Sequence, residues 1–291
     1  MKLQFFKKLG PEKIVWVAAL LYAVVFLILV FWKYNHFYYD NLDLAIFNNV
    51  FYNTLHGNWF TASIHPPSYL GDHFSPLIIL LLPLYAFAPR PETLLVFQTL
   101  IIAATALPVY YVARMLVGAD KKWLACFIAL LWLVNPSVHN MNFFEFELTP
   151  FAVFFLFLMV YGYLKENTYL FVGASVLALA TREDVALILF CMGRVAGGQK
   201  KKPFWIWYPL VAGFGYVLLA FVIIQHFAPA GSYKFLIYYG WLGGTSVPGI
   251  AFSFIRHPLL VLQHLLNIKN IEFILGITFP FFFMVISRSA F

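Results

Sequence analysis

Apolar runs long enough to cross a bilayer recur along the chain, and they limit its fold more than any other feature. The first run, Ile14 to Trp32, contains no charged residue. A transmembrane α-helix needs roughly 20 apolar residues, whereas a signal-peptide core is shorter and precedes a small-residue cleavage site. Because 63% of the 291 residues are hydrophobic and 11% are charged, a water-soluble core could not enclose this apolar surface. The sequence therefore predicts an all-α polytopic membrane protein.

We expect about eight transmembrane helices and one further apolar hairpin. The candidate spans are residues 14–32, 93–113, 123–136, 150–164, 169–181, 184–197, 204–227 and 271–287. The shorter spans would have to be tilted, broken or longer than their apolar cores. Residues 76–88 are also short and contain Pro83, so we interpret them as a re-entrant or juxtamembrane element on the outer side.

The distribution of charge predicts how the chain is oriented, because Lys and Arg favour cytoplasmic loops. With a cytoplasmic N-terminus and a re-entrant segment at 76–88, 13 of the 19 basic residues are cytoplasmic and nine of the 12 acidic residues are external. A full span at 76–88 would weaken this asymmetry. The net charge of +7 then reflects orientation and not nucleic-acid binding. We expect a multi-pass protein of the cell membrane whose active face is external.

We interpret residues 1–291 as one transmembrane domain with two long outer segments. The first segment is 33–92, which contains an amphipathic helix at 43–56, and the second is 228–270. Long connections in compact proteins commonly carry function. Few residues follow the last apolar run, which indicates a C-terminal truncation. Cys126 and Cys191 lie in apolar segments and are expected to be small core residues.

Four short acidic clusters interrupt the apolar runs, and the predicted orientation places all of them outside. Ionisable groups near hydrocarbon are costly, so they indicate function. In the first cluster, Asp40 and Asp43 precede a stretch that has apolar residues at helical spacing and ends at His56 and Gly57. We expect a helix on the membrane surface. An acid at its start serves either as an N-cap or as a general base.

The second cluster, Asp72 and His73, follows a Pro-rich segment at His65 and precedes the apolar hairpin. Asp and His together can bind a metal or share a proton, although a Pro-rich turn with a helix cap explains the same residues. In the third cluster, Glu145 and Glu147 alternate with phenylalanines. An extended backbone would place both carboxylates on one side, where they could hold a divalent cation such as Mg²⁺ or Mn²⁺. The alternative is a solvated loop in an aromatic interface belt.

The fourth cluster, Arg182-Glu183-Asp184, interrupts what would otherwise be one long apolar run and predicts a charged turn. A guanidinium binds phosphate bidentately and stays charged, so Arg182 could reach an anionic group with Glu183 or Asp184 as its partner. The alternative is an intramolecular ion pair. The sequence contains no Walker loop, dinucleotide fingerprint, His-Glu-x-x-His zinc motif or Gly-x-Ser-x-Gly elbow. Gly193 and Gly197 form a weak helix-packing signal.

The order of these motifs resembles a family of uncharacterised prokaryotic polytopic membrane proteins with a domain of unknown function. A first span is followed by an outer Asp that opens an amphipathic helix ending in Leu55-His56-Gly57. His73-Phe-Ser-Pro76 then precedes an apolar hairpin, and an acidic motif precedes Pro150. A basic-Glu-Asp-Val turn comes last. The resemblance covers roughly residues 14–225, and the family is itself similar to GT-C glycosyltransferases, which use polyprenyl-phosphate sugar donors.

The resemblance implies a GT-C-like fold and an inverting sugar transfer at the outer face. It assigns Asp43 as the catalytic base, with Asp40 as an additional acid, and Arg182 as a contact of the lipid phosphate. Glu145 matches a second acidic position. The chain departs from the family pattern at Glu147, where a His is expected, and at Thr149, where an acid is expected, and this weakens the case for a metal held by Glu145 and Glu147. The substrate-binding candidates are Arg182, Glu183, Asp184, His73, Asp72 and His56.

Two other functions fit the same sequence. Broken spans and intramembrane charges are typical of transporters, so a lipid or solute transporter or a flippase is one alternative. A non-catalytic GT-C-like scaffold is the other. Acidic residues that gather at one surface instead of the bilayer midplane favour the enzyme. The partners that we expect are a lipid-linked sugar donor and membrane lipid, with an acceptor that the sequence does not identify.

Overall fold

The computed structural model describes residues 10–39, 42–63, 68–228, 234–243 and 246–278. In these ranges the chain is helical apart from turns, loops and one isolated bridge between Thr61 and Ser68, which confirms the predicted all-α class. The chain divides into two compact units, Met1–Gly231 and Ser232–Phe291.

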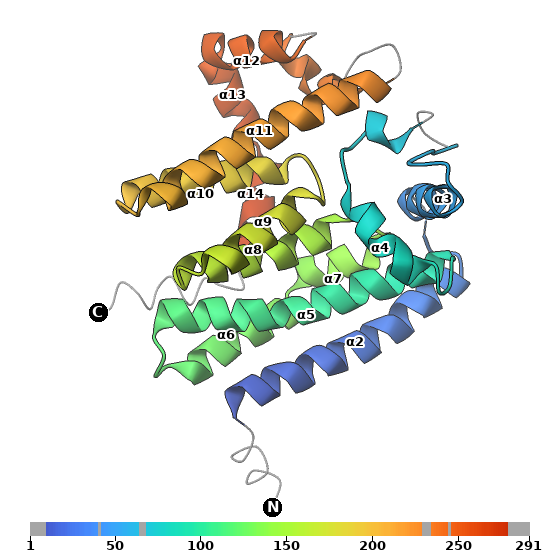
Figure 1. The fold of residues 1–291 in the computed structure, drawn as a ribbon, viewed down its shortest axis with the longest axis vertical. Coiled ribbons are helices and arrows are strands. Elements are labelled where there is room, and N and C mark those ends of the chain that lie inside the picture. Colours follow the sequence, from blue (N-terminus) through green and yellow to red (C-terminus); the bar gives the residue numbers. More distant parts are fainter. Residues whose placement is uncertain (1–9, 40–41, 64–67, 229–233, 244–245, 279–291) are drawn as a thin grey trace, which may run out of the picture. The chain divides into compact units, whose positions relative to one another are not determined.

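The first unit contains most of the helices (Figure 1). They are α2 (Pro11–Asn35), α3 (Asp43–Leu55), the 3-10 turn η1 (Tyr69–Gly71), α4 (Leu77–Tyr85), α5 (Pro91–Val117), α6 (Lys122–Val134), α7 (Pro136–Phe143), α8 (Thr149–Leu164), α9 (Thr168–Leu179), α10 (Val185–Gly198) and α11 (Pro203–Phe227). The described helices of the second unit are η3 (Lys234–Leu242), α12 (Val247–Arg256), α13 (Pro258–Leu265) and α14 (Ile268–Thr278).

Among the described residues, three helices are long and apolar enough to cross a bilayer alone, namely α2, α5 and α11. The bent pair α6 and α7 adds a fourth if it is one broken span. The expectation of about eight spans is therefore not supported. Helices α8, α9 and α10 have 16, 12 and 14 residues. At about 1.5 Å per residue, each is shorter than a hydrocarbon core of about 30 Å.

The break between α6 and α7 has a local cause. Pro136 is the first residue of α7, and the side chain of Asn135 accepts a hydrogen bond from the backbone N–H of Ser137 at 2.8 Å. A proline that follows a capping residue starts a new helix, so the axis bends there, by 42°. Helix α4 has only nine residues, including Pro83, and cannot cross a bilayer. This agrees with a re-entrant or juxtamembrane element, and its side of the membrane remains a prediction.

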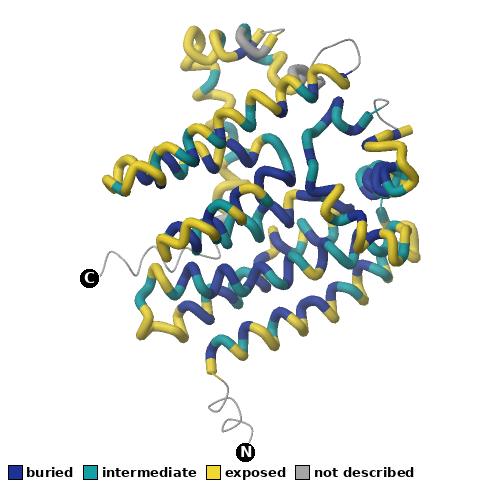
Figure 2. Tube along the Cα trace, in the orientation of Figure 1, coloured by how far each residue is buried: buried dark blue, intermediate teal, exposed yellow. Residues whose placement is uncertain are grey.

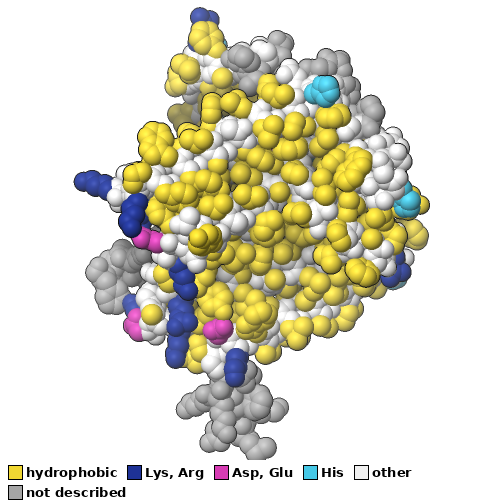
Figure 3. All heavy atoms as spheres, in the orientation of Figure 1, with side chains coloured by type: hydrophobic (Ala, Val, Ile, Leu, Met, Phe, Trp, Pro, Cys, Tyr) yellow, Lys and Arg dark blue, Asp and Glu magenta, His cyan; other side chains and the backbone are white. Residues whose placement is uncertain are grey.

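Helix α5 packs against α2, α6 and α8, while α8 pairs with α9 and α10 pairs with α11 (Figure 1). The buried residues lie mainly where helices meet, and exposed residues lie on the outward faces (Figure 2). Many exposed side chains are large and apolar, and they cover much of the face seen in Figure 3. Apolar patches of this extent mark a membrane-facing surface.

The α10–α11 pair depends on glycine. A Cβ atom added at Gly213 would lie 2.7 Å from the carbonyl oxygen of Ala186, too close for any larger residue. The packing contact predicted at Gly193 is present, since a Cβ there would lie 2.8 Å from the carbonyl oxygen of Ile206. A Cβ atom added at Gly197 would meet only Cγ2 of Ile206, at 3.9 Å, so the close approach of the two helices does not require a glycine there.

The two cysteines differ in burial, and both are free thiols. Cys126 in α6 is buried in the core, as expected, whereas Cys191 in α10 is exposed. The prediction that Cys191 is a core residue was wrong, because this position faces away from the neighbouring helices.

Contacts between helix ends show which turns share one end of the first unit. Tyr111 near the end of α5 donates a hydrogen bond to Glu12 at the start of α2, at 2.6 Å, and its ring contacts that of Tyr161 in α8. Tyr163 donates to Gln199 after α10 at 2.7 Å. We call this the basic end. Its described basic residues are Lys13, Arg114, Lys121, Lys122, Lys165, Arg194, Lys200, Lys201 and Lys202.

The opposite ends of the same helices carry the acidic clusters, and we call this the acidic end. Lys33 at the end of α2 donates a hydrogen bond to the carbonyl oxygen of Phe143 at 2.8 Å, and Leu77 N–H donates to the carbonyl oxygen of Ala180 at 2.8 Å. The described acidic residues here are Asp43, Asp72, Glu92, Glu145, Glu147, Glu183 and Asp184. Acidic and basic clusters therefore lie at opposite ends, as predicted. Which end is external remains a prediction.

The segments predicted as outer loops are largely helical where the structure describes them. Residues 33–92 contain α3, η1 and α4, and residues 228–270 contain η3, α12, α13 and the start of α14. The predicted span 271–287 is helical to Thr278, and its remainder lies outside the described residues.

Candidate functional site at the acidic end

Helix α3 begins at Asp43, as the sequence predicts, but its N-terminus is capped from elsewhere in the chain. The N-cap residue is Leu42, whose side chain makes no capping hydrogen bond. Instead, the backbone N–H of Leu44 donates to Oε2 of Glu145 at 2.7 Å. The first N–H groups of a helix have no partner within it, and a carboxylate there also interacts favourably with the helix dipole. Glu145 is 2% exposed, so water does not compete for this bond.

The apolar face of α3 packs into the protein core. Leu44, Phe47 and Phe51 are buried, and both aromatic rings make edge contacts with the ring of Phe146. We expected this face to lie on the membrane surface, and that expectation was wrong, because protein already covers it. The helix is therefore a rigid support that holds Asp43 at a defined place.

A buried glutamine holds the loop between α7 and α8. Gln98 in α5 is fully buried; its Nε2 donates to the carbonyl oxygen of Glu145 at 2.6 Å, and its Oε1 accepts from the N–H of Glu147 at 2.7 Å. The amide thus fixes the backbone on both sides of Phe146. The sequence interpretation missed Gln98, although a lone amide inside an apolar span is a recognisable signal.

Glu147 lies within the electrostatic reach of three other parts of the site. Burial raises the pKa of its carboxyl group, and the charge of Asp43 raises this pKa further. Arg182 and His73 act in the opposite direction and lower this pKa, but the net effect is an increase. Three residues from three other segments therefore act on the carboxyl group of Glu147. A carboxyl group with a raised pKa beside a charged partner is typical of functional sites.

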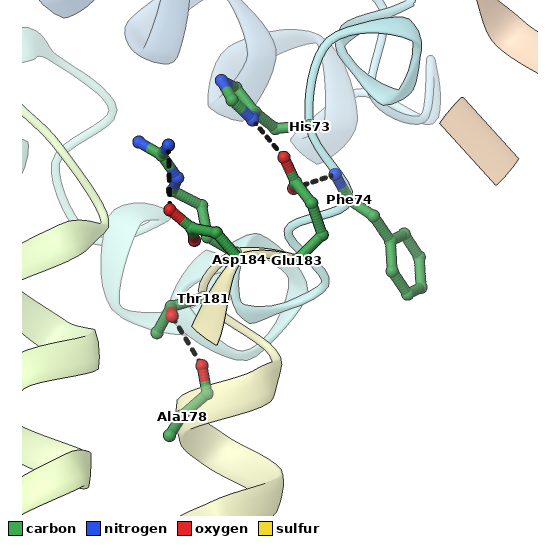
Figure 4. A network of polar contacts seen from close by, with 7 residues as sticks. His73, Phe74, Ala178, Thr181, Glu183 and Asp184 are labelled. Atoms are coloured by element: carbon green, nitrogen blue, oxygen red, sulfur yellow. Dashed lines mark hydrogen bonds and ion pairs between the residues drawn. The ribbon is translucent and has the colours of Figure 1, made fainter. Parts of the chain in front are cut away.

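The turn between α9 and α10 is fastened to the segment before α4 by Glu183 (Figure 4). One carboxylate oxygen of Glu183 lies 2.9 Å from Nδ1 of His73, and the other accepts the backbone N–H of Phe74 at 3.2 Å. Burial raises the pKa of Glu183, but the hydrogen bond and charge of His73 and the backbone hydrogen bonds together outweigh burial, so the pKa is lowered. Glu183 is therefore an ionised anchor for His73.

Arg182 is half-buried and pairs with the exposed Asp184, with Nη2 and Oδ2 3.2 Å apart. Burial opposes the charged guanidinium, but Asp184, Glu147 and Glu183 outweigh it and raise the pKa of Arg182. Its Nε is buried and makes no hydrogen bond to the described protein atoms. Arg182 thus remains a permanent cation next to the acidic groups.

The remaining candidates divide into two groups. Asp72 is buried directly after η1 and before His73, next to the same turn. His56 lies at the far end of α3 from Asp43, roughly 20 Å along the axis at about 1.5 Å per residue. It is exposed, and its Nδ1 lies 2.8 Å from the carbonyl oxygen of Tyr52. The structure therefore does not bring His56 to the others. Asp40 and His65 lie outside the described residues.

The third acidic cluster, Glu145 and Glu147, is the cation site that the sequence predicts. No group of three or more His, Cys, Asp or Glu side chains among the described residues is placed to hold a metal ion. Glu145 already uses a carboxylate oxygen to cap α3, in a buried position. Divalent Mg²⁺ and Mn²⁺ prefer several oxygen ligands. A cation held by Glu145 and Glu147 therefore stays a prediction, and the described residues add no third His, Cys, Asp or Glu ligand to it.

Comparison with known families identifies one family to which this chain is similar over most of its length. Residues 33–291 match the family model described as "Predicted membrane protein (DUF2079)". The chain belongs to this family. The match covers α3, the α7–α8 loop and the α9–α10 turn, which together carry the site described above. No curated protein and no solved structure matches the chain. Membership of this family and the three long apolar helices together identify an integral membrane protein.

Proposed function

We propose that the protein transfers a sugar from a polyprenyl-phosphate donor to an acceptor hydroxyl at the acidic end. The observation that carries the proposal is the grouping of Asp43, His73 and Arg182 around Glu147, whose carboxyl group each of them affects although they come from separate segments. The site thus combines carboxylates with a permanent cation. The likeness to GT-C enzymes rests on the sequence motifs around Asp43, His73 and Arg182.

In this proposal Asp43 is the general base. The acceptor oxygen attacks the anomeric carbon of the donor, and its proton passes to the carboxylate of Asp43. The bond between the anomeric carbon and the phosphate oxygen breaks, and the electron pair leaves with the polyprenyl phosphate. Attack from the face opposite the leaving group inverts the anomeric configuration. A positioned general base typically contributes a factor of about 10²–10⁴ to the rate.

Arg182 would stabilise the phosphate as the bond to the sugar breaks. A guanidinium offers several N–H donors in a fixed plane, and its buried Nε makes no hydrogen bond to the described protein atoms. His73, oriented by Glu183, would lie beside the same phosphate or the sugar hydroxyls. Because the donor carries its reactive carbon at the membrane surface, the chemistry needs no nucleotide-binding domain.

The position of charge along the spans favours the enzyme over a transporter. In α2, α5 and α11, charged side chains occur only within the first or last four residues. Transporters commonly bind their substrates near the bilayer midplane, at broken helices. A site at the helix ends suits chemistry at the membrane surface better than passage through it.

The proposal is tested with the full chain in lipid nanodiscs, a panel of polyprenyl-phosphate sugars and a panel of acceptors that carry free hydroxyl groups. Release of polyprenyl phosphate is measured for the wild type and for Asp43→Asn. Glu166→Gln, which removes a carboxylate at the basic end, is the matched control. We expect release from at least one donor with the wild type and the control, and little with Asp43→Asn. Equal release by Asp43→Asn would remove Asp43 as the base, and no release from any donor would contradict the proposed transfer.

A further inference from the structure

The basic end carries more positive charge than its internal contacts neutralise. Nine basic and three acidic residues lie there among the described residues. In contacts between described residues, Lys201 forms an ion pair with Glu166, and Lys165 lies over the ring of Tyr161. The other basic residues have no ion-pair partner in the part of the chain that the structure describes. Most of the Lys and Arg side chains visible in Figure 3 gather along one edge of the apolar face.

Two helices begin inside this cluster of basic residues, although a helix N-terminus ordinarily favours negative charge. Lys121 is the N-cap of α6 and Lys122 its first residue, while Lys202 is the N-cap of α11. Neither N-cap side chain makes a capping hydrogen bond. A helix N-terminus already carries partial positive charge and unpaired N–H groups, so lysines there are unfavourable unless an anion is present.

Aromatic residues place these lysines at the depth of lipid headgroups. Trp123 and Trp207 are exposed, and each lies within about one turn of the start of its helix. Exposed tryptophans at helix ends are typical of the membrane–water interface. Helix α11, which Lys202 precedes, is one of the three helices able to span a bilayer. An anion at this level is in the plane of the phospholipid phosphates.

We propose that the basic end binds the phosphate groups of anionic phospholipids through Lys121, Lys122, Lys200 and Lys202. All four side chains are exposed. A phosphate anion would offset the repulsion among the lysines and accept hydrogen bonds from the uncapped helix N-termini. Lysine suits this role because its flexible ammonium group follows a mobile headgroup as a point charge.

The experiment reconstitutes the full chain in nanodiscs that contain equal amounts of phosphatidylcholine and phosphatidylglycerol. The lipids retained by the released protein are then counted by native mass spectrometry. In the wild type, we expect retained phosphatidylglycerol to exceed phosphatidylcholine by at least about threefold. Replacing the four lysines with Gln lowers the ratio to near one, and replacing them with Arg keeps it. Lys201 is left in place so that its pair with Glu166 persists.

Arg90→Gln, which removes a positive charge at the acidic end, is the control and leaves the ratio unchanged. Equal melting temperatures of the Gln and Arg quadruple variants establish that both fold. A wild-type ratio near one, or full enrichment in the Gln variant, overturns the proposal. Phosphate and chloride are then compared at matched ionic strength. If phosphate displaces more of the retained phosphatidylglycerol than chloride does, the site binds free phosphate and the lipid proposal is overturned. Equal displacement by the two salts supports lipid binding.

Discussion

The backbone N–H of Leu44 and the carboxylate of Glu145 meet at 2.7 Å although 101 residues separate them in the sequence. This bond fixes the start of α3 against the α7–α8 loop, and Gln98 fixes that loop against α5. Asp43 precedes Leu44, so its place in the site depends on Glu145. We therefore interpret Glu145 as a positioning residue for Asp43.

Glu145→Ala is expected to destabilise the protein by about 1–3 kcal/mol, because it leaves a buried N–H without an acceptor. Glu145→Gln keeps a carbonyl acceptor and is expected to cost less. The measurement is thermal unfolding of the purified protein in detergent, with Glu166→Gln as a carboxylate control at the basic end. Equal melting temperatures for Glu145→Ala and the wild type would show that the bond does not hold α3.

Glu147→Gln is expected to raise the melting temperature at pH 7–8. Burial and Asp43 raise the pKa of this carboxyl group above 4.5 in the folded state, so folding favours its protonated form. Its favourable contribution to stability is complete below the unfolded pKa and is lost as pH rises through the folded pKa. The increase in melting temperature that Glu147→Gln causes should therefore shrink as pH is lowered toward 4.5. A gain that is constant across this range would contradict the raised pKa.

Glu183→Gln is expected to show the opposite pH dependence. The pKa of Glu183 is lowered in the folded state, because His73 and backbone hydrogen bonds together outweigh burial, so its ionised form stabilises the fold. That contribution is present above the unfolded pKa and is lost as pH falls through the folded pKa. The variant should melt below the wild type at neutral pH and converge with it in acid. A constant difference in melting temperature between the variant and the wild type at all pH values would show that the Glu183–His73 contact does not stabilise the fold through charge.

Gly213→Ala and Gly215→Ala form a matched pair in α11. A methyl group at Gly213 would lie 2.7 Å from the carbonyl oxygen of Ala186, whereas at Gly215 it would meet nothing within 4 Å. Gly213→Ala should lower the melting temperature by forcing α10 and α11 apart. Gly215→Ala should leave it unchanged or raise it, because Ala favours helix by up to about 1 kcal/mol over Gly. The same effect at both positions would show that the α10–α11 distance is not the cause.

The sequence predicts the local features of this fold better than the distant ones. The start of α3 at Asp43 and the short apolar element that contains Pro83 follow from residues close together in the chain, and the acidic and basic ends follow from counting charges. The number of spans does not follow, because hydropathy marks apolar segments without showing whether a helix such as α9 is long enough to cross. The apolar face of α3 misled the interpretation, since the same pattern suits a core or a membrane surface.

The contacts that assemble the site join residues far apart in the sequence. His73 and Glu183 are 110 residues apart, and Glu147 is 49 residues from Gln98. A single sequence identifies such residues as polar exceptions in apolar surroundings but does not pair them. For that reason the Arg182-Glu183-Asp184 turn was predicted, while the role of Glu183 as the anchor of His73 was not.

The most direct test of the proposed transfer is the rate of donor consumption by Asp43→Asn. It is measured with the donor that the wild type uses, on protein that melts at the wild-type temperature. Loss of a general base predicts a rate at least about 100-fold lower than that of the wild type, with Glu166→Gln unaffected. A folded Asp43→Asn variant that consumes the donor at the wild-type rate would contradict the account.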